Sequence, residues 1–390
     1  MTSKERLLAA ISGDRPDHVP CSFMIFRALR NRCKDIFEFA ERQLEMGLDA
    51  RMDFGIEPAP WYHADLHGLP VRFHPEVEIR EWREDRPGER YPVLCKEYVT
   101  PAGTLRTEVY RTEDWPYGDR VPFMEDHIVP RSLKHLVTGR EDVEPLRYLL
   151  IPPADEDLRR FVERYRKVRK FAEDKGLLVA GGWGVGLDAL VWLCGMEELL
   201  LLSMDDPEFV DELLKLVGDW NVERMEPFLD MGVDLFVRRG WYEGMDLWSP
   251  SLFERFVFPY LKGEAELVHQ AGAKFGYIVT SGVMPLVRLL IKAGVDVVIG
   301  IDPVQDRTMD MRALKERAGG RLALWGGVNG FITVEMGSAE EVRRAVREAL
   351  DTLGPDGFVL SPVDNVREDR PEVWRNVEVL VETWKEDVNA

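Results

Sequence analysis

Eight short apolar runs recur along the chain, and longer amphipathic segments separate most of them. Each run is nearly continuous in apolar residues, whereas a strand with one solvated face would alternate apolar and polar positions. Continuous runs are typical of strands that are covered on both faces, as in a parallel sheet. We predict strands at 19–26, 49–55, 176–184, 233–240, 274–282, 295–303, 321–329 and 357–365.

The segments between these strands carry apolar residues three and four positions apart, the spacing of one face of an α-helix. Examples are 207–232, 249–272, 283–294 and 338–354. Asp206-Pro207 and Ser249-Pro250 each place a capping residue and a proline at a helix start. Strand–helix alternation repeated eight times predicts an α/β protein with a (β/α)8 TIM barrel. The alternative is an open doubly wound sheet, and the lack of a G-x-G-x-x-G after the first strand weakens it.

The alternation breaks at 56–153, a stretch rich in aromatic residues and proline. Within it, CKEYVTPAGTLRTEVYR predicts a hairpin that turns at PAGT. A helix is predicted to follow at 154–175. We therefore expect a single domain, 1–390, in which 56–153 is an insertion between the second and third strands that lies over the barrel mouth.

Composition narrows the class of protein. The net charge is −19, from 70 Asp and Glu against 51 Lys and Arg, and such a surface repels phosphate backbones. No apolar run reaches the roughly 18–20 residues that span a membrane, and the N-terminal MTSKERLLAA lacks the apolar core of a secretory signal. Four widely separated cysteines form no C-x-x-C pair. We expect a cytoplasmic protein with reduced thiols and no nucleic-acid or membrane partner.

Polar residues follow seven of the eight predicted strands, although the strand interiors are apolar. In a barrel, the C-terminal ends of the strands and the loops after them build the active site. We predict Asp53, Glu243 and Asp364 as catalytic carboxyls, with Glu243 and Asp364 as candidate ligands of a divalent metal such as zinc. The predicted substrate-binding residues are Arg27, Arg30, Trp183, Trp241, Tyr277, Ser281, Asp302, Trp325 and Asn365.

Each of these residues also has a purely structural interpretation. Asp53 fits the cap of a turn or the partner of a core arginine. Glu243, among the aromatics of GWYEGMDLW, fits a structural ion pair as well as an acid, base or ligand. Arg238 and Arg239 are adjacent and point to opposite faces of their strand, so one of them faces outward or pairs with an acid. The three tryptophans fit a flat apolar ligand surface and core packing equally.

Several blocks of the sequence, in the same order, resemble the uroporphyrinogen decarboxylase superfamily along nearly the whole chain. They are TSKERLLAAISGDRPDHVP, SPSLFERFVFPYLKGEAELVHQAGAKF, TSGVMPLVRLLIKAGVDVV, LALWGGVNG and GFVLSPVDNV. The resemblance implies a (β/α)8 barrel with a deep cleft at the strand C-termini. It also implies one of two activities, since the superfamily contains tetrapyrrole decarboxylases and methyltransferases that move methyl groups to or from corrinoid proteins or thiols.

The sequence departs from both branches at the expected site. The decarboxylases carry an RQAGR-like element whose arginines hold substrate carboxylates, and here MIFRALR supplies Arg27 and Arg30 in an altered spacing. Asp53 matches the acid of their second strand. The zinc-dependent methyltransferases carry an H-x-C-G element and a later cysteine, which supply soft ligands. Here those positions are Val279, Ser281 and Asp364.

The residues and the resemblance together favour a corrinoid-dependent methyltransferase that demethylates a small methoxylated or methylated compound. The corrinoid would be carried by a partner protein, and the chain itself is expected to form a homodimer. The main alternative is a uroporphyrinogen decarboxylase, in which Asp53 stabilises a protonated pyrrole while Arg27 and Arg30 bind acetate side chains. A third interpretation is a non-catalytic tetrapyrrole- or corrinoid-binding protein.

Overall fold

The structure is a computed structural model that describes residues 1–54, 65–66 and 69–388. The chain divides into two compact units. The first consists of Met1–Phe54, Glu163–Gly181 and the described residues from Leu229 onward. The second consists of residues 65–66 and 69–162, together with Gly182–Phe228.

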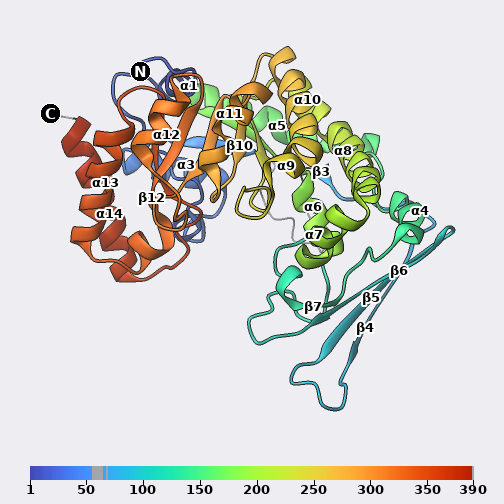
Figure 1. Ribbon diagram of the computed structural model, residues 1–390. Helices are drawn as coiled ribbons and strands as arrows, with labels where there is room; N and C mark the ends of the chain where they lie inside the picture. Colours follow the sequence, from blue (N-terminus) through green and yellow to red (C-terminus); the bar gives the residue numbers. More distant parts are fainter. Residues whose placement is uncertain (55–64, 67–68, 389–390) are drawn as a thin grey trace. The chain divides into compact units, whose positions relative to one another are not determined.

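The first unit is built on a curled parallel sheet of seven strands in the order β1-β8-β9-β10-β11-β12-β13 (Figure 1). The predicted runs from 49–55 onward thus form strands, and their order in the sheet follows the chain. Every residue of β9, β11, β12 and β13 is buried, as expected for strands covered on both faces. The strands are β1 (Arg51–Phe54), β8 (Leu178–Gly184), β9 (Leu235–Arg239), β10 (Lys274–Ile278), β11 (Val297–Ile301), β12 (Ala323–Asn329) and β13 (Phe358–Val363).

The first predicted strand, 19–26, is an irregular segment rather than a regular strand. It forms two isolated parallel bridges to the last strand and its continuation, Cys21 with Leu360 and Ile25 with Asn365. On its other side, the amide of Asp49 donates to the Cys21 carbonyl at 2.8 Å, just before β1 begins. The segment therefore lies between the two ends of the curled sheet, as expected for a TIM-barrel-like fold.

Helices connect the strands where the three-and-four spacing predicted them. Ser249 caps α9 and Ser338 forms a capping box with Glu341 at the start of α13, while Gly294 ends α11 in the left-handed conformation. In Figure 1, α13 and α14 pack side by side. The helices are α1 (Ser3–Ile11), α2 (Arg27–Arg30), α3 (Ile36–Glu45), α5 (Asp155–Lys175), α9 (Pro250–Phe256), α10 (Phe258–Gln270), α11 (Val283–Ala293), α12 (Met311–Ala318), the π-helical turn η3 (Gly330–Glu335), α13 (Ala339–Leu353) and α14 (Pro371–Val388). Within the described part of the chain, no helix combines the length and the apolar character that crossing a bilayer requires.

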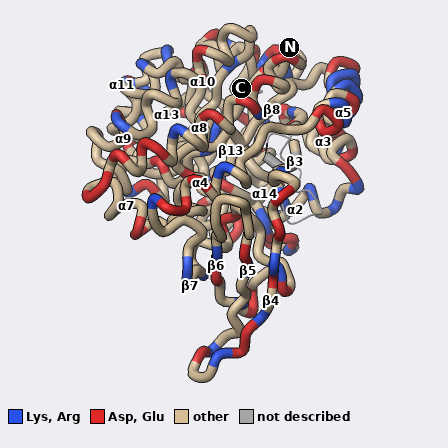
Figure 2. Tube along the Cα trace, turned by 90° about the vertical axis from the view of Figure 1, so that its right-hand side faces the viewer, with Lys and Arg blue, Asp and Glu red and all other residues tan. Residues whose placement is uncertain are grey.

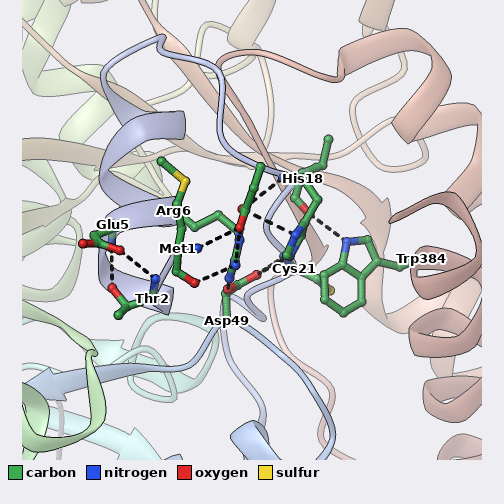
Figure 3. Close-up of polar contacts among 10 residues, drawn as sticks. Met1, Thr2, Glu5, Arg6, His18, Cys21, Asp49 and Trp384 are labelled. Carbon is green, nitrogen blue, oxygen red and sulfur yellow. Dashed lines mark hydrogen bonds and ion pairs between the residues drawn. The ribbon is translucent and has the colours of Figure 1, made fainter. Parts of the chain in front are cut away.

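Polar contacts hold the irregular segment in place at the start of the sheet (Figure 3). Arg6 of α1 donates to Asp49, which is only 2% exposed. The second carboxylate oxygen of Asp49 accepts the amide of Cys21 at 3.1 Å. The indole of Trp384, from α14, donates to the Val19 carbonyl at 2.8 Å. Helices from both ends of the chain thereby fix residues 19–21.

The second unit contains a four-stranded antiparallel sheet in the order β4-β5-β6-β7. Pairing of Thr100 with Gly103 places the β5–β6 turn where PAGT predicted it. Residues 56–64 and 67–68 of the predicted insertion lie outside the described residues, and its place over the barrel mouth stays a prediction. The elements are β2 (Asp65–Leu66), β3 (Leu69–Pro70), β4 (Glu78–Glu84), β5 (Val93–Thr100), β6 (Gly103–Tyr110), η1 (Val129–Arg131), β7 (Ser132–Lys134), η2 (Arg140–Asp142), α4 (Val143–Arg147), α6 (Leu187–Cys194), α7 (Met196–Asp205) and α8 (Pro207–Asp230). Helix α5 begins in this unit and ends in the first.

Lys96 on β5 is fully buried in the second unit, which is costly for an ammonium group. Its Nζ lies 2.6 Å from the Val121 carbonyl oxygen and 3.2 Å from a carboxylate oxygen of Glu81. Burial lowers the pKa of Lys96 to about 8, and the nearby Glu81 only partly opposes this effect.

We expect this lysine to make stability rise with pH in the alkaline range. Between about pH 8 and its ordinary pKa of about 10.4, Lys96 holds a proton in the unfolded chain that it lacks in the folded chain. The free energy of unfolding should therefore rise across this window, by up to about 3 kcal/mol relative to a Lys96→Met variant. Urea unfolding at several pH values measures the difference. Equal pH dependence in both proteins would contradict the assignment.

Candidate functional site

The side chains of β1 alternate between the helix-covered face and the concave face of the curled sheet. Phe54 packs against Tyr165 of α5, with ring centroids 5.3 Å apart, so Met52 and Phe54 face the helices. Arg51 and Asp53 therefore point to the concave face, and both remain partly accessible. Asp53 is the next-to-last residue of its strand, which places its carboxyl near the C-terminal edge of the sheet.

Arg51 holds the Asp53 carboxyl in a fixed orientation. Its Nε donates to Asp53 Oδ1 at 2.7 Å. One terminal nitrogen donates to the Ser22 hydroxyl at 3.0 Å and to the Phe23 carbonyl at 2.9 Å. The other donates to the Met24 carbonyl at 2.9 Å. Four acceptors from the protein thus surround one guanidinium, and Asp53 is the only carboxylate among them.

Trp325, on β12, contacts Arg51 across the concave face of the sheet. The central carbon of the Arg51 guanidinium lies 4.8 Å from the centre of the Trp325 ring system, within cation–π range. β1 and β12 are not neighbours in the sheet, so this contact crosses the concave face. Trp325 is only 1% exposed and donates its indole N–H to the Ser22 carbonyl at 2.9 Å. Trp325 therefore packs against Arg51 and does not present an open surface to a ligand.

Asp53 is a carboxyl whose surroundings disfavour its charged form. Burial raises its pKa above the ordinary value, and the contact with Arg51 opposes this only in part. Its side chain nevertheless keeps 27% of its surface exposed. A carboxyl that is desolvated, oriented and still reachable can give a proton to a bound ligand.

Asp364, Asn365 and Arg27 meet just beyond the C-terminal end of β13. Asp364 has φ 65°, a left-handed conformation that is uncommon outside glycine and that occurs at functional sites. The side chain of Asn365 accepts the amide of Arg27 at 3.2 Å, and the Arg27 side chain is exposed. Arg30, one helical turn later, donates to the Cys33 carbonyl at 3.1 Å. The structure thus gathers three of the predicted residues at one place.

Glu243 belongs to a buried ion-pair network. Its carboxylate accepts from Arg238 at 3.0 and 3.2 Å and from the Tyr277 hydroxyl at 2.6 Å. Arg238 also donates to Glu264 at 2.9 Å, and Glu264 lies on the outer helix α10. The contact with α10 puts this network on the helix-covered face of the sheet. The structure therefore does not bring Glu243 beside Asp53.

Two more predicted residues make contacts that are structural in kind. The Asp302 carboxylate is fully buried; one oxygen accepts the Val304 amide at 2.8 Å and the other accepts Asn329 at 2.7 Å. Asp302 thereby shapes the turn after β11. The Ser281 hydroxyl donates to Asp246 at 2.8 Å in the loop after β10.

The other two predicted tryptophans, Trp241 and Trp183, belong to different units. Trp241 follows β9, and the guanidinium of Arg239 lies 4.9 Å from the centre of its ring system. Arg238 pairs with acids on the opposite face, as the adjacency of the two arginines predicted. Trp183 has φ 69° and belongs to the second unit.

The described residues do not form a cluster that fits a resident metal ion. Within the described ranges, no group of three or more His, Cys, Asp and Glu side chains is arranged to hold one. Glu243, one candidate ligand, gives its oxygens to Arg238 and Tyr277. All four cysteines are buried, and burial raises the pKa of the Cys194 thiol to about 12, which disfavours a thiolate ligand.

Arg51, which holds the carboxyl of Asp53, and Ser22, which accepts a hydrogen bond from Arg51, were not singled out from the sequence. The signal for Arg51 is present, because Arg51 and Asp53 are two apart in one strand and must share a face. Ser22 was not predictable in this role, since it reaches Arg51 only through the irregular course of residues 19–26.

The chain is similar in sequence to one protein family and in fold to solved structures. The sequence profile described as Uroporphyrinogen decarboxylase (URO-D) matches residues 112–386. A search of curated proteins gave no match. Among solved structures, a methyltransferase from Methanosarcina mazei superposes with a TM-score of 0.62 at 18% identity, and 99% of each chain is covered. A B12-independent methionine synthase from Shewanella sp. W3-18-1 gives a TM-score of 0.39 at 13% identity, covering 59% of this chain and 66% of its own. The first of these structures shares its fold with the whole of this chain.

Proposed function

Because this chain belongs to the uroporphyrinogen decarboxylase family, we propose that it is a methyltransferase with a small methoxylated or methylated substrate. The methyl group would pass to a corrinoid carried by a partner protein. The observation that carries the proposal is Asp53, a carboxyl with a raised pKa that faces the concave side of the sheet. Arg51, which lies over the ring system of Trp325, holds this carboxyl in one orientation.

The chemistry of demethylation needs a proton donor at this place. In the demethylation of an ether the carbon–oxygen bond of the methyl group breaks, and a reduced corrinoid on the partner protein would accept the methyl group with its own electron pair. The electron pair of the broken bond stays on the oxygen, which leaves as an alcohol or phenol once it gains a proton. Asp53 supplies that proton, because burial keeps it protonated to higher pH than an ordinary aspartate. Arg51 keeps the carboxyl aimed while the substrate is bound.

Decarboxylation of an acidic tetrapyrrole is the second candidate, and the exposed Arg27, whose amide donates to Asn365, favours it. A substrate with many carboxylates needs several cations that are free to bind them. Arg51 donates to four acceptors of the protein, and Arg238 is buried between Glu243 and Glu264. These two strand arginines therefore bind groups of the protein itself rather than substrate carboxylates, which weighs against this candidate.

One anaerobic experiment separates the two activities. The purified protein is incubated with cob(I)alamin and a panel of methoxyarenes and methylamines, and methylcobalamin is followed by its absorbance. We expect methylcobalamin with at least one donor, at a rate above that of a protein-free sample. In parallel, the protein is incubated with uroporphyrinogen. Formation of coproporphyrinogen without methylcobalamin across the panel would contradict the proposal and establish the second candidate.

A further inference from the structure

A groove lies on the outer face of helices α11 and α12, away from the concave face of the sheet. Its volume is about 670 Å³, within the range of small-molecule sites. Four basic residues line it: Arg288, Lys292, Arg317 and Arg321. Lys and Arg are drawn in blue in Figure 2, where α11 is labelled. The groove is basic although the chain as a whole carries a net charge of −19.

These four cations make no ion pair with any carboxylate in the part of the chain that the structure describes, although all four are exposed. Other exposed arginines are paired; Arg347, for example, lies 3.2 Å from Glu386. Two of the four are positioned by other contacts. Arg317 donates to the Met284 carbonyl at 3.2 Å, and the Lys292 ammonium lies 5.0 Å from the centre of the Phe258 ring. An anion in the groove would relieve the repulsion between these like charges.

The floor of the groove is apolar. Met284, Val287 and Ile291 lie three and four positions apart on α11, so they form one stripe along the helix. Arg288 and Lys292 follow next to this stripe, one helical turn apart. A ligand that lies along α11 would therefore contact an apolar surface and a row of positive charges at the same time.

We propose that this groove binds an amphiphilic organic anion, in which an acidic head group is attached to an apolar body. The head group, a phosphate, sulfonate or carboxylate, binds to the four cations, and the body lies on the α11 stripe. Neither part is sufficient alone, because the charges are exposed to water and the apolar stripe is narrow. The site is separate from Asp53 and does not depend on the proposed methyl transfer.

The test uses the full chain and the fluorescent aromatic anion 1-anilinonaphthalene-8-sulfonate. We expect saturable binding that dodecyl phosphate displaces, while inorganic phosphate and the uncharged dodecyl maltoside displace it poorly. A double variant, Arg288→Ser with Lys292→Ser, should raise the Kd of the probe about tenfold. Both positions are exposed, so circular dichroism should be unchanged.

The matched control is Arg343→Ser with Arg347→Ser, which removes the same charge from another helix, α13. We expect this control to bind the probe as the wild type does. Three results would overturn the proposal: no saturable binding, equal loss of binding in both double variants, or displacement by dodecyl maltoside as effective as by dodecyl phosphate.

Discussion

Replacing Arg238 by methionine is expected to lower the free energy of unfolding by about 3–5 kcal/mol. The guanidinium is 1% exposed and lies between two buried carboxylates, those of Glu243 and Glu264. Methionine fills much of the same volume, but it leaves both carboxylates without the cation that stabilises them. Urea unfolding of the wild type and of Arg238→Met near neutral pH measures the loss.

Two further variants separate the network from a general effect of losing an arginine. Arg347→Met removes an arginine that is 59% exposed and should cost less than about 1 kcal/mol. Combining Arg238→Met with Glu243→Gln and Glu264→Gln removes the unpaired charges and should restore part of the loss. A loss for Arg238→Met no larger than that for Arg347→Met would contradict the buried network.

Replacing Asp53 by asparagine is expected to slow methyl transfer by about 10²–10⁴-fold. Asparagine has nearly the same shape and can still accept the hydrogen bond of Arg51, but it cannot give up a proton. The loss should fall on kcat more than on KM, because the proton moves in the transition state. The rate of methylcobalamin formation under saturating donor measures it.

The pH profile gives the sign of the effect. Asp53 acts in its protonated form, so the wild-type rate should fall as pH rises through the raised pKa of this carboxyl. The Asp53→Asn variant should lack that decrease. Asp351→Asn makes the same chemical change on the exposed face of α13 and should leave the rate unchanged. An Asp53→Asn enzyme as fast as the wild type would exclude the role assigned to this carboxyl.

Much of the sheet could be predicted from sequence, because strands buried on both faces leave continuous apolar runs. The runs from 49–55 onward became strands in chain order. The segment at 19–26 did not become a regular strand. Pro20 has no N–H to donate to a neighbouring strand, and the Ser22 hydroxyl accepts a hydrogen bond from Arg51. An apolar run alone does not report such local interruptions.

The site was less predictable than the fold. Alternation along β1 placed Asp53 on one face, yet the sequence does not say which face is concave. Glu243 shows the limit most clearly, because its surroundings are set by contacts far away in the chain. Arg238 also pairs with Glu264, which lies on the later helix α10, and Tyr277 lies on the next strand, β10. Of these partners only Arg238 lies in the local sequence around Glu243, whereas Glu264 and Tyr277 lie far along the chain.

The most direct test of the account is an infrared titration of the Asp53 carboxyl, read as the difference between the wild type and Asp53→Asn. An ordinary aspartate has a pKa of about 3.9 and is ionised at higher pH. We predict that the wild type keeps a protonated carboxyl band at pH values above this one and that the variant lacks it. A band that is lost near pH 4, as for a solvent-exposed aspartate, would contradict the claim that burial prepares Asp53 to donate a proton.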